Sequence, residues 1–333
     1  NVKIWLYFTK RRKNMKKSNL TKKFMTVAII FTATFSLTGC ANTKPAAEQV
    51  KDITEAYKSG DSKTFYKSME KNETYDHYFD AVEKKPTSGL GSFYVKLNEK
   101  AKDITVKPDE KDKTFDIPVE ISSYDAYDVA IKKMYAAAKN GPEAFADMPT
   151  WLCAALDDAK VTTDSVKFNT RTTDSSSIRY LFNSNKNFFK NLTFGLSDFM
   201  DATITTCKKD KDVTCLLAQG DEVLFSADYY YTSLKGTGLS KAQVKQYTKK
   251  LIKEYKKYKN VLTDVTYDGK GITQVVFIDY STVSTVTLHR LGLISSSSVG
   301  SISLKKTIDG FKSEGLTCVT DTFGITPKEE KEK

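Results

Sequence analysis

Apolar and polar positions follow two different periods along this chain. Apolar residues recur three to four positions apart at Val50–Tyr57, Phe65–Met69 and Tyr75–Val82, which predicts three one-sided helices. The period falls to two near Ile104–Val106 and Phe115–Ile121, and two such runs around a charged turn predict a β-hairpin with one buried face. Helical spacing then returns at 125–139 and 142–159, and short strand-like runs follow at 166–168 and 178–181.

The pattern repeats its change of period in the C-terminal third. A stripe of apolar residues predicts a long helix over 239–258, with Ser240 as its N-cap. Asp264–Tyr267 is expected to pair with Thr273–Tyr280 across a glycine-containing turn. A short helix and a second one at 305–314 follow. Helices, then a hairpin, then more helices and strands predict an α+β fold in two small parts.

The positive charge of the chain is concentrated at one end. The 333 residues carry a formal net charge of +11, and residues 1–39 hold nine Lys and Arg and no acid, which leaves +2 for the rest. A nearly neutral remainder has no general attraction to nucleic acid. We therefore expect no nucleic-acid partner.

The N-terminal segment has the layout of an export signal. From Met15, which we expect to be the true start, a lysine-rich stretch precedes 14 mostly apolar residues, Phe24–Leu37. A permanent membrane span needs about 20 apolar residues, so this run is short for one and predicts a cleaved signal peptide.

The last residue of this run and the three that follow it resemble the lipobox of bacterial lipoproteins: Leu37, Thr38, Gly39 and Cys40. The resemblance implies that the thiol of Cys40 receives a diacylglyceryl group, that the bond before it is cleaved, and that Cys40 becomes the acylated N-terminus. The protein would then be held on the extracytoplasmic face of the cell membrane. Each acyl CH₂ buried in the bilayer adds to the binding free energy, so more than one acyl chain anchors a protein far better than a single chain does.

The first folded part resembles the NTF2-like (cystatin-like) domains of Gram-positive lipoproteins. The features that carry the resemblance are Lys58–Asp61 at a helix end, the strand Phe115–Ser122 leading into Tyr124-Asp125, and Asn183–Asn185 followed by Phe188–Leu196. Tyr180 and Phe194-Gly195 stand where the family often has a Trp and a double Gly. The resemblance implies a curved sheet with a pocket between sheet and helix.

The second part resembles the YehR-like lipoproteins. The matching segments, in order, are Gly220–Val223, Leu239–Val244, Asp264–Tyr267, Thr273–Tyr280 and Ser301–Leu304 before a helix at 305–314. The resemblance implies a small secreted α+β domain with a long amphipathic helix on an antiparallel sheet, and it implies no particular chemistry.

The expected organisation of the chain has five segments. They are 1–39, upstream residues and signal peptide; 40–49, acylated cysteine and tether; 50–201, the NTF2-like domain; 202–326, the YehR-like domain; and 327–333, a charged tail.

Four cysteines remain after Cys40. Cys207 and Cys215 flank a polar turn, so two strands joined there would bring the thiols close and make this pair the candidate disulfide. Cys153 is expected to be a small buried thiol, with a Cys153–Cys318 bridge between the two parts as the alternative. The chain has no C-x-x-C, which excludes a thioredoxin motif and a four-cysteine zinc site.

Catalytic and cofactor motifs are missing from the sequence. His77 and His289 are the two histidines, and no nucleophile elbow, zinc-protease, P-loop or dinucleotide pattern occurs. We expect no catalytic residue, no metal and no cofactor. An enzymatic alternative would need a buried carboxylate with a shifted pKa in the NTF2-like pocket, and Asp76 and Asp80 are equal candidates for it.

Lysines gather on the predicted helix at 239–258. Within 17 residues the helix carries Lys241, Lys245, Lys249, Lys250, Lys253, Lys256 and Lys257, with Glu254 as the acid among them. Lys245, Lys249, Lys253 and Lys256 are the candidates for contact with an anionic surface. The alternative is a solvated face that keeps the domain soluble, which is the commoner role of such a run.

Two functions of different class follow from the sequence. The first is a non-enzymatic binding or interaction module of the cell envelope, held to the membrane through diacylglyceryl-Cys40, with an envelope protein or an anionic wall polymer as partner. The second is a solute-binding lipoprotein that serves a transporter. That function predicts repeated βαβ units, which the chain lacks.

Overall fold

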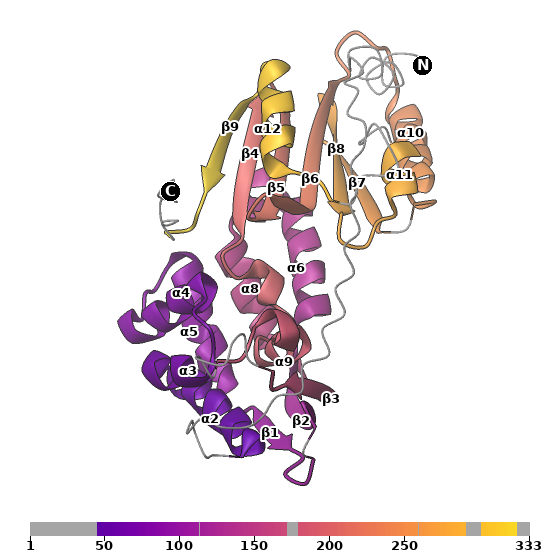
Figure 1. Ribbon diagram of the computed structural model, residues 1–333. Helices are drawn as coiled ribbons and strands as arrows, with labels where there is room; N and C mark the ends of the chain where they lie inside the picture. The colour runs from indigo at the N-terminus through magenta and orange to yellow at the C-terminus, as the bar shows by residue number, and fades with distance from the viewer. Residues whose placement is uncertain (1–44, 113, 172–178, 259, 291–300, 325–333) are drawn as a thin grey trace, which may run out of the picture. The chain divides into compact units, whose positions relative to one another are not determined.

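The structure is a computed structural model that describes residues 45–112, 114–171, 179–258, 260–290 and 301–324. Its helices are α2 (Ala46–Ser59), α3 (Ser62–Ser68), α4 (Glu73–Lys84), α5 (Gly89–Ala101), α6 (Tyr127–Asn140), α7 (Pro142–Ala146), α8 (Met148–Asp157), α9 (Lys186–Leu192), α10 (Lys241–Tyr255), α11 (Thr285–Arg290) and α12 (Leu304–Ser313), with 3-10 turns η2 (Asn183–Asn185) and η3 (Ser197–Phe199) (Figure 1). Its strands are β1 (Thr105–Pro108), β2 (Asp116–Asp125), β3 (Lys160–Asn169), β4 (Thr203–Lys209), β5 (Asp212–Gln219), β6 (Glu222–Ser233), β7 (Val261–Tyr267), β8 (Gly271–Asp279) and β9 (Thr317–Asp321). Helices combined with antiparallel sheets confirm the α+β class.

The described residues between 45 and 283, together with 301–324, form one large compact unit. The described segment that carries α11 lies outside this unit. All sites described below are built from the large unit.

Local capping signals set the first three helices. α2 ends at Gly60, whose left-handed backbone (φ 74°) suits glycine. The side chain of Asp61 then accepts a hydrogen bond from the Thr64 amide at the start of α3, and Asn72 does the same for the Tyr75 amide at the start of α4. The three helices predicted from spacing are confirmed.

A three-stranded antiparallel sheet, in the order β1-β2-β3, follows these helices. Val119 and Ile121 of β2 alternate with outward-facing residues and are fully buried. Val106 of β1 lies opposite Ile121, which confirms the predicted hairpin. Phe115, which the alternation also placed on the buried face, lies before β2 and is 62% exposed.

The second sheet has six strands in the order β7-β8-β6-β5-β4-β9, and each neighbouring pair is antiparallel. One face carries Leu217, Phe225 and Phe277 into a large buried cluster that also contains Phe145 of α7. The other face carries Leu216 into a smaller cluster covered by Leu304 and Phe311 of α12. The expected pairing of Asp264–Tyr267 with the strand at 273–280 is confirmed as β7 and β8.

The two sheets fall on either side of the expected boundary at 201–202, but their buried side chains belong to one continuous core. Ring contacts cross the boundary, from Tyr135 to Phe277 (centroids 5.6 Å apart) and from Phe199 to Phe225 (5.9 Å). Lys139 of α6 also pairs with Asp264 of β7, with Nζ and Oδ2 3.0 Å apart.

Several elements differ from the sequence expectation. α5 was not predicted, although its apolar spacing is helical, because glycines at 89 and 91 obscure its first turn. The single helix expected at 142–159 is divided into α7 and α8 at Asp147. Pro149 has no backbone N–H, so it cannot donate the hydrogen bond to the preceding turn that a continuous helix would need. Tyr180 forms an isolated bridge with Met69 instead of a closing strand, and residue 178 lies outside the described residues.

Candidate functional site

An open cavity of about 1030 Å³ lies between α4, α5, α7, the start of α8 and the residues at the end of β9. α4 contributes His77, Asp80, Ala81 and Lys84, which recur at three- and four-residue spacing and therefore share one helix face. The opposite face of α4 places Tyr78 and Phe79 in the core. The cavity therefore borders the polar face of α4, while the apolar face of the same helix packs in the core.

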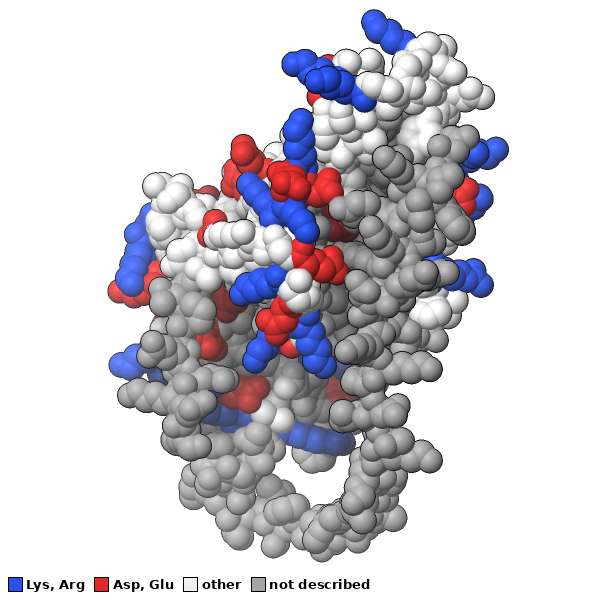
Figure 2. Space-filling model, turned by 90° about the horizontal axis from the view of Figure 1, so that it is seen from above, with Lys and Arg blue, Asp and Glu red and all other residues white. Residues whose placement is uncertain are grey.

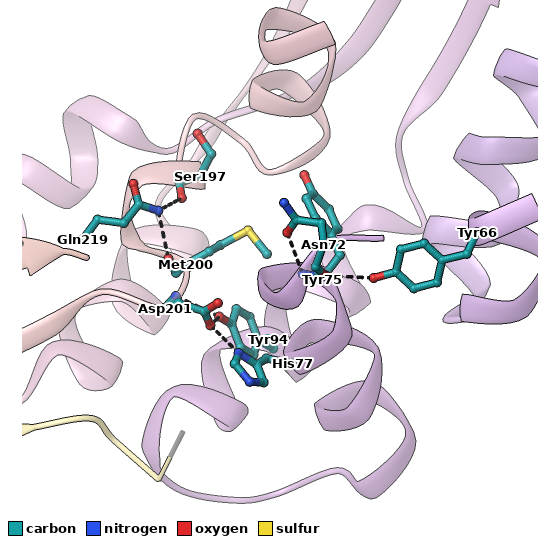
Figure 3. A network of polar contacts seen from close by, with 9 residues as sticks. All are labelled: Tyr66, Asn72, Tyr75, His77, Tyr94, Ser197, Met200, Asp201 and Gln219. Atoms are coloured by element: carbon teal, nitrogen blue, oxygen red, sulfur yellow. Dashed lines mark hydrogen bonds and ion pairs between the residues drawn. The ribbon is translucent and has the colours of Figure 1, made fainter. Parts of the chain in front are cut away.

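A polar network joins His77 and Tyr94, which line this cavity, to Asp201, which does not (Figure 3). The Asp201 carboxylate accepts hydrogen bonds from the Tyr94 hydroxyl (2.7 Å) and, at the same oxygen, from His77 Nδ1 (3.0 Å). The Tyr94 hydroxyl in turn accepts a hydrogen bond from the Asp201 amide (3.0 Å). The two side chains of the His77–Asp201 pair are largely buried, with 23% and 18% of their surface exposed.

Two neighbouring contacts fix the segments that carry this network. Gln219 of β5 donates hydrogen bonds from Nε2 to the carbonyls of Ser197 and Met200, the segment that leads into Asp201. Tyr66 donates to the carbonyl of Asn72, the residue that caps α4 (Figure 3). The position of His77 relative to Asp201 is therefore set by both parts of the core.

Burial and charge keep Tyr94 a donor. Burial raises the pKa of Tyr94 well above its ordinary value, and the neighbouring Asp201 charge raises it further. A protonated Tyr94 and a carboxylate at Asp201 hold the imidazole with Nδ1 toward the acid. In the neutral ring this leaves Nε2 as a hydrogen-bond acceptor on the side away from Asp201 (Figure 3).

The last described residues close one side of the cavity. We call Asp321–Gly324 the C-terminal strap. The Phe323 carbonyl accepts a hydrogen bond from the Leu90 amide at the start of α5 (3.1 Å), and Phe323 packs against the main core. Gly89 allows this approach, because a Cβ at its position would lie 2.4 Å from the Phe323 oxygen.

The candidate disulfide Cys207–Cys215 is wrong. Cys207 is bonded to Cys318, while Cys215 and Cys153 are free. β4 and β5 do form the expected hairpin, but Cys207 lies opposite Thr214, so Cys207 and Cys215 point to opposite faces of the sheet. Cys318 of β9 lies directly opposite Cys207 with 4.0 Å between Cα atoms. The alternative Cys153–Cys318 bridge is excluded by the same pairing.

The two free thiols are protected. Burial raises the pKa of Cys215 to about 11 and also raises the pKa of the half-buried Cys153. Cys215 packs in the main core, where its sulfur lies near the Pro142 carbonyl. Both pack against the core, although Cys153, expected to be buried, is only half-buried.

Three of the four candidate lysines lie on α10, and Lys256 is its C-cap residue; the helix begins with a full capping box between Ser240 and Gln243. Lys245, Lys249, Lys253 and Lys256 are all exposed. Val244 and Tyr255 form the buried side of the helix. Seen from above, Lys and Arg side chains lie among Asp and Glu across the middle of the described surface, without a broad patch of one sign (Figure 2).

Other expected site residues are placed as follows. Leu37, Thr38, Gly39 and Cys40 lie outside the described residues. Asp76 lies 3.7 Å from Lys71, and Asp80 is exposed and pairs with Lys84, so neither is the buried carboxylate that an enzymatic function requires. Over the described ranges, no helix combines the length and apolar character of a membrane span. The same residues contain no cluster of His, Cys, Asp and Glu suited to a metal ion.

The His77–Asp201 pair was missed at the sequence level. The two residues are 124 positions apart, and no local motif links them. The spacing of His77, Asp80 and Lys84, three and then four residues apart, was the sequence signal for the polar face of α4.

No family model matches the sequence, and no curated protein does. Among solved structures, the chain is similar in part to the NMR structure of the E. coli YehR protein, with 15% identity over 39% of this chain and 96% of that chain and a TM-score of 0.31. It is also similar in part to the NMR structure of a protein from Streptococcus pneumoniae TIGR4, with 14% identity over 35% of this chain and 84% of that chain and a TM-score of 0.26.

Proposed function

We propose that this chain is a lipoprotein on the extracytoplasmic face of the cell membrane, anchored through a diacylglyceryl group on Cys40, and that it acts as a non-enzymatic binding or interaction module of the envelope. The observation that carries the location is the Cys207–Cys318 disulfide. Disulfides persist in oxidising compartments and are rare in the cytosol, so the bond supports export by the signal-like segment.

The family assignments belong to this proposal. The first part is NTF2-like, supported by helices that precede a small antiparallel sheet. The second part is YehR-like, supported by the capped helix α10 placed between β6 and the β7–β8 hairpin. Neither assignment brings a catalytic residue with it.

The cavity supports binding over catalysis. His77 and Asp201 have the geometry of a base and its orienting acid, but in the described part of the chain no hydroxyl or thiol makes a hydrogen bond to His77. The antiparallel order of both sheets also favours this module over a solute-binding lipoprotein with two βαβ lobes.

Metabolic labelling with a palmitate analogue tests the anchor. We expect label in the full chain and in Cys153→Ala, a matched change at a half-buried thiol, and no label in Cys40→Ala. We also expect globomycin, which blocks the lipoprotein signal peptidase, to leave the uncleaved form in the membrane. Label that persists in Cys40→Ala, or its absence from all three chains, would contradict the anchor.

The lysines of α10 are proposed to contact an anionic wall polymer or lipid surface. Each lysine close to such a surface contributes about 1 kcal/mol. Changing Lys245, Lys249, Lys253 and Lys256 to Gln should therefore weaken sedimentation with anionic vesicles and remove its salt dependence. The matched control changes four exposed lysines outside α10, Lys63, Lys67, Lys85 and Lys102, to Gln. Equal losses in the two variants would contradict a specific role for α10.

A further inference from the structure

The cavity next to His77 has an excess of negative charge. Among the described residues that line it are four carboxylates, from Asp80, Glu143, Asp147 and Asp321, and one lysine. That lysine, Lys84, already has its Nζ 2.7 Å from Asp80, and this pairing raises its pKa. The rim therefore attracts cations, although the chain as a whole is basic.

His77, which lines the cavity, adds a nitrogen that can accept a hydrogen bond. Because Nδ1 is bound to Asp201, the free nitrogen of the neutral ring accepts a hydrogen bond and donates none. In the described structure Asp201 is the hydrogen-bond partner of this side chain, which leaves Nε2 for a ligand that carries an N–H or O–H donor.

Part of the remaining lining is apolar, although Ser88 and the hydroxyl of Tyr94 also belong to it. Pro86 packs so near α5 that a Cβ on Gly91 would lie 2.4 Å from its ring. Phe323 of the strap adds further apolar surface, and Pro149 of α8, itself largely buried, borders the cavity. Such a lining suits an aliphatic stem, and about 1030 Å³ is at the upper end of the volumes of ligand pockets.

An anionic ligand fits less well. The start of α5 borders the cavity, and a helix N-terminus attracts anions. However, the Phe323 carbonyl already accepts the hydrogen bond of the Leu90 amide there. The carboxylates of Glu143 and Asp147 would also repel the negative charge of such a ligand.

We propose that this cavity binds an alkylammonium group, an ammonium on an aliphatic stem as in a lysine side chain or a polyamine. His77 Nε2 accepts a hydrogen bond from the ammonium, Glu143 and Asp147 balance its charge, and Pro149 and Phe323 contact its stem. The inference rests on the proposed binding function and gives it a site and a ligand class. It is independent of the lipid anchor.

A titration followed at the histidine ring tests the site. The chain has two histidines, so the full chain with ¹⁵N-labelled histidine in nonionic micelles gives two sets of ring signals, which the variant His289→Gln assigns. The probe is acetyl-Gly-Lys-Gly-amide. Two matched peptides carry norleucine or glutamate in place of lysine, which separates the ammonium from the stem. We expect the lysine peptide to shift the His77 Nε2 signal in a saturable way, the norleucine peptide to bind more weakly, and the glutamate peptide to leave the signal unchanged.

Charge-matched variants locate the binding. Glu143→Gln with Asp147→Asn should weaken binding of the lysine peptide roughly three- to tenfold, because exposed ion pairs contribute little individually. The control Glu83→Gln with Glu99→Gln removes the same charge from exposed positions on α4 and α5 outside the lining, and it should bind like the unchanged chain.

Equal loss in the two double variants, equal binding of the three peptides, or a His77 signal that does not move would each overturn the inference. These outcomes leave the Cys40 labelling result intact. Conversely, failure of the labelling would contradict the anchor and leave the titration standing, so the two proposals fail separately.

Discussion

At the scale of single residues, Asp201 is the centre of the candidate site. Its backbone is left-handed (φ 58°), a conformation that aspartate adopts more readily than most residues. That turn directs its amide and its carboxylate toward one hydroxyl, that of Tyr94, which both accepts and donates. The remaining contact of the carboxylate goes to His77. Tyr94 is therefore a positioning residue for the imidazole.

Removing this hydroxyl tests that role. In Tyr94→Phe, the Asp201 amide and carboxylate lose their shared partner, and a group left without its hydrogen bond costs about 1–3 kcal/mol. We expect urea denaturation to show a loss of that size, and the His77 ring nitrogens to shift in NMR spectra. The matched control is Tyr267→Phe, whose hydroxyl contacts the Gly269 carbonyl at the surface. Equal stability losses in the two variants would contradict the role of Tyr94.

A second residue, Asp221, links pH to the docking of α12. The Lys305 amide and the Ser303 hydroxyl donate to its carboxylate and lower its pKa below the ordinary 3.8. A lowered pKa in the folded state means that the stabilisation is present above about pH 4 and is lost as pH falls through the folded value. We expect the protection of the α12 amides, measured against the intrinsic exchange rate at each pH, to fall more than elsewhere as the pH drops below about 4.

Two variants of equal charge separate this effect from general acid destabilisation. Asp221→Asn should show low protection of the α12 amides both above and below pH 4, because the carboxylate is gone. Asp309→Asn, on α12 itself and exposed, should keep the pH dependence of the unchanged chain. A pH dependence that survives in Asp221→Asn would show that another group is responsible.

At the scale of elements, helices could be predicted better than strand partners. Caps are local, so Ser240 and Gly60 mark helix ends within a few residues of sequence. Disulfide pairing depends on which face a cysteine occupies, and a shift of one residue in register reverses that face. The hairpin of β4 and β5 could be predicted from the sequence, but the faces of the sheet on which Cys207 and Cys215 lie could not. The strand that carries the partner cysteine, β9, joins the sheet from more than a hundred residues away.

The Cys207–Cys318 bond should make a large contribution to stability. It closes a loop with a sequence separation of 111, and the removal of a native disulfide costs about 2–5 kcal/mol. We expect Cys207→Ala to lower the free energy of unfolding by this amount under oxidising conditions. The control Cys153→Ala, at a half-buried free thiol, should cost less than about 1.5 kcal/mol.

Peptide mapping without reduction checks the same pairing directly. The peptide that contains Cys207 should be recovered joined to the peptide that contains Cys318. Alkylation of the folded chain should be slow at Cys215, since a thiol with a pKa of about 11 is almost entirely protonated at neutral pH. A Cys207–Cys215 crosslink would contradict the register of β4 and β5.

At the scale of the whole chain, the large unit is tied together by contacts that no local pattern encodes. The fold class followed from hydrophobic periods, because periodicity reports which face of an element is buried. The cavity could not be predicted, because the residues that line it, among them His77, Glu143 and Phe323, come from distant segments of the chain. Its position depends on the shared core, where Phe277 of the second sheet packs on Tyr135 and Phe145 of the helices.

The C-terminal strap gives a test at this scale. Gly89 has φ +64°, and a Cβ there would meet the Phe323 carbonyl oxygen, so Gly89→Ala must both strain the backbone and displace the strap. Gly269 has φ +88° with nothing within 4 Å of a Cβ, so Gly269→Ala carries backbone strain alone, about 1–2 kcal/mol. We expect Gly89→Ala to lower the free energy of unfolding by about 1 kcal/mol more than Gly269→Ala, because the Leu90–Phe323 hydrogen bond is lost.

Hydrogen exchange at the Leu90 amide should accelerate in Gly89→Ala and stay slow in Gly269→Ala, and protease cleavage after Phe323 should follow the same order. If Leu90 stays protected in Gly89→Ala, the strap does not close the cavity in solution, and the apolar contact that Phe323 would give to an alkylammonium stem is lost with it.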